Sequence, residues 1–366
     1  MYRRFQNRRT VRAEFALTTA TLLTMALAGN VQAAEIRSVG PDGEAAVDAS
    51  TIELTDDQIA QIKEGGYTAA ICLHYGGNDW STSQQKGLED TFGELGIEIV
   101  AVTDANFSAE TQVSNIETVM AKKPDILVSI PTDATATADA YKQAAAAGIK
   151  IVFMDQRANG LEAGKDYVSV VSADNYGNGY ASGTVLGDAL GGKGKVAMVY
   201  YDANFAPTNQ RDEGFRDAMK NYPDIEIVTE QGFTDESGCA EQGDAILTQF
   251  PNIDGIYASW DVPMEGVLSA VRAAGMEGKV TLACNDLGNN VAREIASGNI
   301  AGGGAQMPYD QGVAEAKLAA LALLGEETPS YVAVPAETVT HENVLEAYTD
   351  VYHVETPDWL KEAYVE

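Results

Sequence analysis

Basic residues are scarce in this sequence of 366 residues, which has 24 Lys and Arg against 54 Asp and Glu. The net charge of −30 leaves little basic material for a groove that follows a phosphate backbone, so nucleic acid is not an expected partner. Apolar residues make up 45% of the chain and can fill a substantial core, which argues against disorder and against a small disulfide scaffold. The length predicts one large or two medium domains.

Cysteine is almost absent, with Cys72, Cys239 and Cys284 as the three examples and no C-x-x-C motif among them. This spacing argues against a zinc site. Cys72 and Cys284 lie in apolar, strand-like runs and are typical of small core residues, although one pair could form a disulfide in an oxidising compartment.

Motifs of nucleotide-binding and hydrolytic enzymes are also missing. The glycine-rich stretch 191–194 precedes a predicted strand instead of opening a helix, and no Walker or G-x-G-x-x-G pattern follows the first strand. Neither G-x-S-x-G nor H-E-x-x-H occurs. We therefore expect a protein that is not an enzyme and has no catalytic residues, metal or cofactor. The sequence does contain pairs of carboxylates, which are the residues that glycosidases use, so residue type alone does not exclude a glycosidase.

One long apolar run, from Phe15 to Gly29, lies near the N-terminus, behind five arginines. Its fifteen residues are fewer than the roughly 20 of a spanning helix, and Val31-Gln32-Ala33 resembles a cleavage site. The pattern predicts a signal peptide at 1–33, and the general secretory route is favoured over the twin-arginine route. We expect a soluble periplasmic protein, because no cysteine stands at the cleavage site to be lipidated, and its mature charge would be −34.

The rest of the chain alternates between strand and helix patterns, after a polar segment at 34–55 that is expected to be a flexible lead and a short helix at 55–63. Apolar runs without polar alternation, each followed by a helical pattern, predict parallel sheets covered on both faces. Strands are expected at 67–74, 97–103, 125–130, 150–154, 167–171, 195–201, 225–230, 255–258, 280–284 and 300–305. Helices are expected at 81–95, 109–121, 134–147, 180–190, 209–221, 237–250, 262–274 and 289–297. The rhythm restarts after 172–175, so the sequence predicts two tandem α/β units of similar size, joined by a hinge.

Polar and aromatic side chains follow the strands of both units, where ligands of parallel sheets bind. Carboxylates, amides and Arg bind hydroxyl groups, and aromatic faces pack on C–H groups. The strand-end residues that form this set are His74, Asn78, Asp79, Trp80, Ser81, Pro131, Thr132, Asp133, Asp155, Gln156, Arg157, Asn209, Gln210, Arg211, Phe233, Trp260, Asp261, Asn285, Asp286 and Gln306. Some have structural alternatives: Asp133 and Asn209 could cap helices, His74 and the tryptophans could be core residues, and Arg211 could pair with a surface carboxylate.

Several ordered stretches resemble a known family. They are ILVSIPTD at 126–133, IVFMDQR at 151–157, VSADN at 171–175, RDEGF at 211–215, Cys284-Asn285-Asp286 and Gln306-Met307-Pro308. From about Tyr67 onward the chain resembles the periplasmic sugar-binding proteins of ABC importers, in the ribose-binding-like class of type I solute-binding proteins. The resemblance implies two Rossmann-like, doubly wound parallel-sheet lobes with three hinge crossings and a ligand between them. The N-terminal lobe would comprise 67–173 plus 307–337, and the C-terminal lobe 174–306 plus 338–366.

Carried over position by position, the resemblance and the strand-end set together predict a substrate-binding site. The site comprises His74, Asn78, Asp79, Trp80, Ser81, Asp155, Gln156, Arg211, Phe233, Trp260, Asp286 and Gln306, with Ile130 as a further family contact position. Ribose binders usually have a small hydroxyl residue at the position of His74, two Phe at 80–81, and Asn at the positions of Ile130 and Trp260. These departures argue against ribose and favour another small sugar or a short polyol such as a tetritol or pentitol.

The resemblance implies a function as well as a fold. The protein would capture a small sugar or polyol as a monomer and deliver it to the permease and ATPase of an ABC importer. The alternative is a sensor that docks on a chemoreceptor with a sugar or an autoinducer-type ligand. Sugar-responsive repressors share the fold but carry an N-terminal DNA-binding helix-turn-helix, where this chain has a signal peptide.

Overall fold

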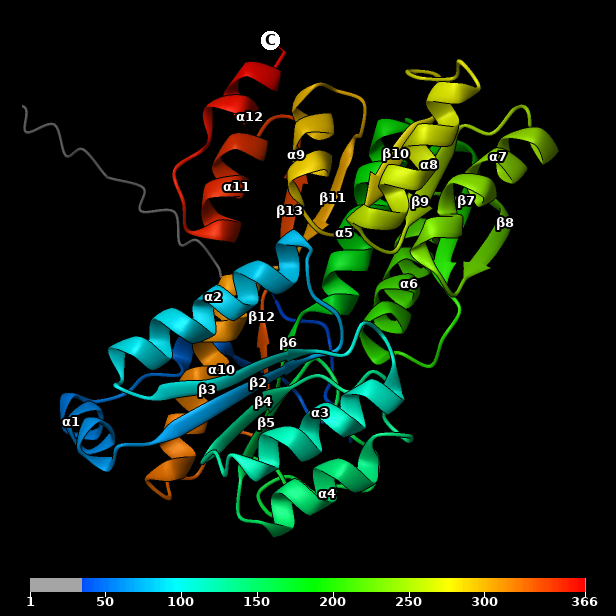
Figure 1. The fold of residues 1–366 in the computed structure, drawn as a ribbon. Helices are drawn as coiled ribbons and strands as arrows, with labels where there is room; N and C mark the ends of the chain where they lie inside the picture. The colour runs from blue at the N-terminus through cyan, green and yellow to red at the C-terminus, as the bar shows by residue number, and fades with distance from the viewer. Residues whose placement is uncertain (1–34, 366) are drawn as a thin grey trace, which may run out of the picture. The chain divides into compact units, whose positions relative to one another are not determined.

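The computed structural model describes residues 35–365, and the predicted signal peptide lies outside the described residues. The strands form a seven-stranded sheet in the order β1-β12-β6-β5-β4-β2-β3 and a six-stranded sheet in the order β13-β11-β10-β9-β7-β8. We call the units built on these sheets the N lobe and the C lobe (Figure 1). Every strand pair is parallel except β11 with β13, so the predicted α/β fold with two parallel-sheet lobes is confirmed.

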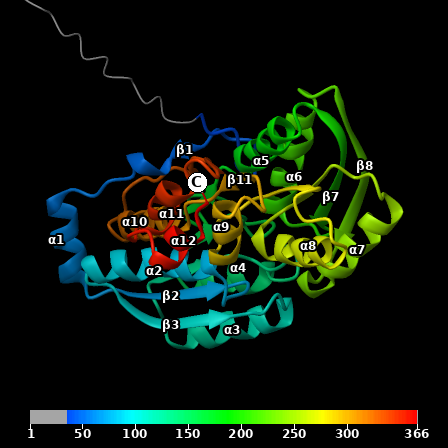
Figure 2. The same cartoon turned by 90° about the horizontal axis from the view of Figure 1, so that it is seen from above.

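The N lobe carries helices on both faces of its sheet, with α2 and α10 on one face and α3 and α4 on the other (Figures 1 and 2). Its strands are β1 (Val47–Asp48), β2 (Thr68–Leu73), β3 (Glu98–Asp104), β4 (Ile126–Ser129), β5 (Lys150–Met154), β6 (Ser169–Ala173) and β12 (Tyr331–Val334). Its helices are η1 (Ala49–Thr51), α1 (Asp56–Gly65), α2 (Asp79–Glu94), α3 (Ala109–Ala121), α4 (Ala138–Ala146) and α10 (Pro308–Leu323). Central strands such as β4 and β5 are apolar except for one end residue each, Ser129 and Lys150, because both of their faces are covered.

The C lobe has the same layered arrangement. Its strands are β7 (Lys193–Tyr201), β8 (Asp224–Phe233), β9 (Gly255–Ala258), β10 (Thr281–Cys284), β11 (Gly302–Ala305) and β13 (Glu337–Thr340). Its helices are α5 (Asn175–Ala189), α6 (Ala206–Met219), η2 (Glu236–Gly238), α7 (Cys239–Gln249), α8 (Asp261–Ala273), α9 (Asn289–Ala296), α11 (Val344–Tyr352) and α12 (Asp358–Ala363). The chain passes between the two sheets after β6, after β11 and after β12.

Helix α5 begins five residues before the expected start at 180. The Asp174 side chain caps it by accepting a hydrogen bond from the Gly177 backbone N–H at 3.0 Å. Glycines weaken the helical pattern of this turn, which is why the sequence did not reveal the start. Gly179 is required by packing, because a Cβ there would lie 1.8 Å from the Arg211 carbonyl oxygen on α6.

The segment expected to be a flexible lead is instead packed against both lobes. The Arg37 and Ser38 backbone N–H groups donate to the Asp174 carboxylate at 2.9 and 2.8 Å, and β1 pairs with β12. Asp42 accepts from the Arg157 guanidinium at 2.6 Å. The polar composition of this N-terminal segment therefore reflects fixed hydrogen bonds rather than flexibility.

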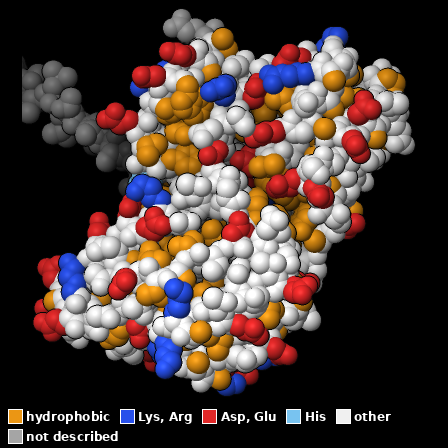
Figure 3. All heavy atoms as spheres, in the orientation of Figure 1, with side chains coloured by type: hydrophobic (Ala, Val, Ile, Leu, Met, Phe, Trp, Pro, Cys, Tyr) orange, Lys and Arg blue, Asp and Glu red, His pale blue; other side chains and the backbone are white. Residues whose placement is uncertain are grey.

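The three cysteines are free and buried, so the structure contains no bridge between any two of them. Between residues 35 and 365 there is no helix with the length and apolar character needed to cross a membrane. Acidic side chains are spread over the face drawn in Figure 3, and Lys and Arg are sparse there.

Candidate functional site

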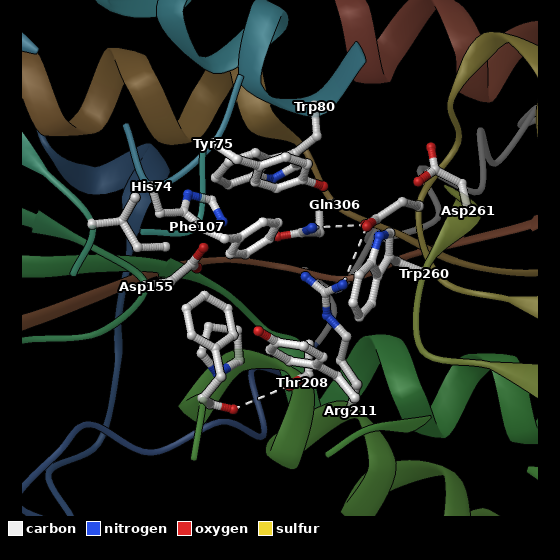
Figure 4. A pocket seen from close by; sticks show the side chains of 15 residues that line it. His74, Tyr75, Trp80, Phe107, Asp155, Thr208, Arg211, Trp260, Asp261 and Gln306 are labelled. Carbon is white, nitrogen blue, oxygen red and sulfur yellow. Dashed lines mark hydrogen bonds and ion pairs between the residues drawn. The ribbon is translucent and has the colours of Figure 1, made fainter. Parts of the chain in front are cut away.

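A cavity lies between the two lobes, at the carboxyl ends of strands from both sheets (Figure 4). The N lobe contributes the loops that follow β2 to β5 and the first turn of α2. The C lobe contributes β7, α6, the start of α8 and the loops after β10 and β11. The lining residues are His74, Tyr75, Trp80, Phe107, Ile130, Asp155, Tyr201, Phe205, Pro207, Thr208, Arg211, Trp260, Asp261, Asp286 and Gln306. Seven of the twelve predicted site residues are among them: His74, Trp80, Asp155, Arg211, Trp260, Asp286 and Gln306.

Arg211 is the centre of a hydrogen-bonded cluster on the C-lobe side. Its guanidinium donates to the Asn175 side chain at 2.8 Å and to Asp286 Oδ2 at 3.1 Å, and Gln306 Nε2 donates to Asp286 Oδ1 at 2.7 Å. Burial alone would lower the pKa of Arg211, but the carboxylates of Asp286 and Asp155 more than offset it, and the pKa is raised. The cluster therefore presents a fixed cation and a fixed acceptor, which suits hydroxyl groups.

Asp155 faces this cluster from the N lobe. Its Oδ1 accepts from Ser172 Oγ at 2.9 Å and from Gln311 Nε2 at 3.2 Å, and it has no partner at Oδ2 among residues 35–365. Burial raises the pKa of Asp155, although Arg211 and these hydrogen bonds oppose the shift. One oxygen of the carboxylate is thus held by its own lobe and the other is available to a ligand.

Two of the three cavity carboxylates share an unusual backbone conformation. Asp155 follows β5 with φ of 53°, and Asp286 follows β10 with φ of 69°. Residues other than glycine seldom adopt this left-handed region, and such strain is concentrated at functional sites. In each lobe the strained turn places one carboxylate at the carboxyl end of a strand.

The apolar part of the cavity is built around His74. Its ring stacks on Phe205 at 5.6 Å and meets Phe107 and Trp80 edge-on at 5.1 and 5.7 Å. Burial lowers the pKa of His74 to about 3, so the imidazole is neutral at physiological pH. His74 is therefore both a packed residue and part of the cavity wall.

The other five predicted residues lie outside the cavity lining, because other contacts occupy them. Asn78 caps α2 by accepting from the Ser81 N–H at 2.7 Å, and Ser81 is buried behind it. Asp79 accepts from the Asn289 backbone and side chain of the C lobe at 2.8 and 2.7 Å.

Gln156 spans the lobes, donating to the Pro131 carbonyl at 2.7 Å and accepting from the Ala206 N–H at 3.1 Å. Phe233 packs behind Trp260, with ring centroids 5.0 Å apart.

Other strand-end residues have structural partners as well. Asp133 accepts from the N–H groups of Thr135 and Ala136 at 2.8 and 2.7 Å, which fixes the turn before α4; the helix itself begins at Ala138, so Asp133 is not its cap. Arg157 pairs with Asp42 and donates to the Leu161 carbonyl at 2.6 Å, so it is directed to the N-terminal segment.

The predicted site omitted Tyr75, Phe107, Tyr201, Phe205, Pro207, Thr208 and Asp261, which also line the cavity. Asp261 was one of the strand-end residues of the sequence analysis. Phe107 and Phe205 also follow strands, β3 and β7, so their position after a strand is the sequence signal that could have identified them. No group of three or more His, Cys, Asp or Glu in the described part of the chain is arranged to hold a metal ion.

The chain is similar in sequence to several known proteins. The ribose import binding protein of Salmonella typhimurium is 24% identical over 74% of this chain and 90% of its own length. The D-ribose/D-allose-binding protein of Pseudomonas aeruginosa is 29% identical over 72% of this chain and 83% of its own.

Two solved structures of solute-binding proteins with a bound sugar are also similar to this chain. An ABC transporter periplasmic solute-binding protein from Actinobacillus succinogenes with bound D-allose is 29% identical, with a TM-score of 0.70 over 76% of this chain and 99% of that one. One from Agrobacterium vitis, bound with α-D-tagatopyranose, is 26% identical, with a TM-score of 0.73 over 78% and 98%. The sequence profile described as periplasmic binding protein domain matches residues 69–327. The chain belongs to this periplasmic binding protein family, in its ribose-binding-like branch.

Proposed function

We propose that the protein captures a small sugar or polyol between its lobes in the periplasm and delivers it to the permease and ATPase of an ABC importer. The observation that carries the proposal is the cavity between the lobes, where a charged cluster from one lobe faces aromatic rings and a carboxylate from the other. Polar groups of this kind orient hydroxyls, and aromatic faces pack on C–H groups. The carbohydrate-binding relatives support the same class of ligand.

Capture would proceed by hinge closure. A ligand that contacts both lobes stabilises the closed arrangement through contacts that the open one lacks. We assign 67–173 plus 307–337 to the N lobe, to which β1, η1 and α1 also belong, and 174–306 plus 338–366 to the C lobe, whose strand β13 begins at Glu337. Export would use the signal peptide at 1–33. In the closed form the Asp79–Asn289 and Gln156–Ala206 hydrogen bonds join the two lobes.

A thermal-shift screen of the mature chain against pentoses, hexoses and polyols tests the proposal, with amino acids as controls. A ligand at 100 times its Kd should stabilise the protein by about 2.7 kcal/mol. Transfer to the importer is tested in proteoliposomes, where the loaded protein should stimulate ATP hydrolysis by the cognate permease complex. Stabilisation by amino acids with no effect of any carbohydrate would contradict the proposal.

A further inference from the structure

Three buried polar atoms on cavity-lining side chains have no hydrogen-bond partner within residues 35–365. They are His74 Nδ1, Trp80 Nε1 and Gln306 Oε1. His74 and Gln306 are only 4% and 3% exposed, so water does not readily satisfy them. Unpaired buried groups are rare in proteins, and here the three belong to one cavity.

A neutral ligand that both donates and accepts hydrogen bonds can pair with all three of these atoms. The indole N–H of Trp80 only donates. Gln306 already uses its amide nitrogen on Asp286, so its oxygen remains as an acceptor. The neutral imidazole of His74 has one donor and one acceptor nitrogen. A hydroxyl group can pair with each of the three, whereas a carboxylate or an ammonium group can pair with only some of them.

The cavity is small, with a volume of about 40 Å³. One water needs roughly 10–15 Å³ on this scale, so the space corresponds to about three waters, or about three hydroxyl positions. Ile130, Trp80 and Trp260 are among the side chains that line this space. Each further ligand carbon must displace these side chains, and a rigid pyranose ring must displace more of them than an open chain that can bend.

We propose that this cavity selects an acyclic polyol of about four carbons over the ring form of a hexose. The inference rests on the proposed function and gives it a ligand class. Hydroxyls of such a chain satisfy the three unpartnered atoms while its C–H groups pack on the indoles. A four-carbon chain carries four hydroxyls, enough to pair with the three unpartnered atoms, and displaces fewer lining side chains than a hexose ring.

Isothermal titration calorimetry of the mature chain tests this with erythritol, L-threitol, xylitol, D-ribose and D-allose. We expect one of the two tetritols to bind at least tenfold more tightly than D-allose. Ile130→Ala widens the cavity and should shift the ratio of the two affinities toward D-allose by at least threefold. Ile116→Ala, an equally buried isoleucine on α3 away from the cavity, is the matched control and should leave the ratio unchanged.

The outcomes separate this inference from the function on which it rests. Tighter binding of D-ribose or D-allose than of both tetritols would overturn the inference and support the proposed function. An Ile130→Ala variant that folds but keeps the wild-type ratio would also overturn it. Absence of binding by all five compounds would overturn the inference, and the proposed function would then fall only if no other carbohydrate of the thermal-shift screen stabilises the protein.

Discussion

The two lobes have the same architecture but contribute different chemistry to the cavity. The C lobe supplies Arg211, Asp261, Asp286 and Gln306, whereas Asp155 is the single charged residue from the N lobe. The N lobe supplies His74, Tyr75, Trp80, Phe107 and Ile130, and the C lobe adds Tyr201, Phe205 and Trp260 to the aromatic wall. The difference therefore lies in charge: the C lobe supplies most of the groups that orient hydroxyls, whereas both lobes supply rings that exclude water when the lobes close.

The largest effect is expected from Arg211→Ala, which removes the centre of the C-lobe cluster. Breaking a buried ion pair leaves Asp286 without its partner and should lower the free energy of unfolding by about 3–5 kcal/mol. Affinity for the tightest carbohydrate of the panel should fall about a hundredfold, since two charge-assisted hydrogen bonds are lost. Calorimetry measures the ligand affinity, and urea denaturation measures the free energy of unfolding.

Arg216→Ala is the control for this variant, because Arg216 forms an exposed pair with Glu230 at 2.6 Å. Exposed pairs contribute about 0–1 kcal/mol, so both properties should stay near wild type. Unchanged ligand affinity in Arg211→Ala would show that the C-lobe cluster is structural and does not bind ligand.

The C lobe also has a buried carboxylate outside the cavity. Burial raises the pKa of Asp212 to about 7, opposed by a hydrogen bond from Ser259 Oγ. Because the folded pKa exceeds that of the unfolded chain, ionisation of Asp212 destabilises the fold. This cost is complete above pH 7, shrinks as the pH falls, and vanishes below about pH 4.

Asp212→Asn removes that cost. The stability of the variant relative to wild type should therefore fall by about 3 kcal/mol between pH 8 and pH 5, as measured by urea denaturation at each pH. Glu315→Gln is the corresponding variant in the N lobe, where burial raises the pKa of Glu315 well above its usual value. A relative stability of Asp212→Asn that does not change with pH would contradict this account of the C lobe.

A moderate effect is expected from Phe107→Ala in the aromatic wall of the N lobe. The Phe107 ring stacks on Tyr75 at 4.2 Å and contacts His74 at 5.1 Å. Its removal admits water to the closed cavity and should weaken ligand binding about tenfold, with a smaller loss of stability because Phe107 is only partly buried. An affinity loss equal to that of Arg211→Ala would contradict the division of roles between the lobes.

The smallest effect is expected at the rim, where Asp79 of the N lobe accepts two hydrogen bonds from Asn289. Asp79→Ala removes contacts that join the lobes in the closed form, and Asp79 does not itself line the cavity. Each bond contributes about 0.5–1.5 kcal/mol, so the dissociation rate should rise severalfold while ligand preference stays constant. Stopped-flow measurements test the rate, and a changed preference would place Asp79 in the ligand site.

The sequence was sufficient to predict the ten strands from β2 to β11 and most of the helices between them, because buried parallel strands have uninterrupted apolar runs. It did not predict β1, β12, β13 or the helices α10, α11 and α12. It also selected Asp286 and Gln306, which closely follow the buried strands β10 and β11, and Arg211, which lies in the second turn of α6; all three line the cavity. It misplaced Asn78 and Ser81, because a residue after a strand can equally cap the next helix.

Other features depend on contacts that a local pattern does not encode. Phe205 reaches the cavity by stacking on His74, 131 residues away in the sequence and in the other lobe. The N-terminal segment has a disordered-like composition but is fixed by Asp174 and Arg157. Such pairings are decided by tertiary structure.

Closure of the two lobes on a ligand is tested most directly by tryptophan fluorescence. Trp80 and Trp260 line the cavity from different lobes, whereas Trp359 packs against Tyr348 and lies under the Arg293 guanidinium. Titration with the tightest carbohydrate should give a saturable change in emission that persists in Trp359→Phe and is largely lost in the Trp80→Phe, Trp260→Phe double variant. A signal that disappears in Trp359→Phe and persists in the double variant would contradict ligand capture between the lobes.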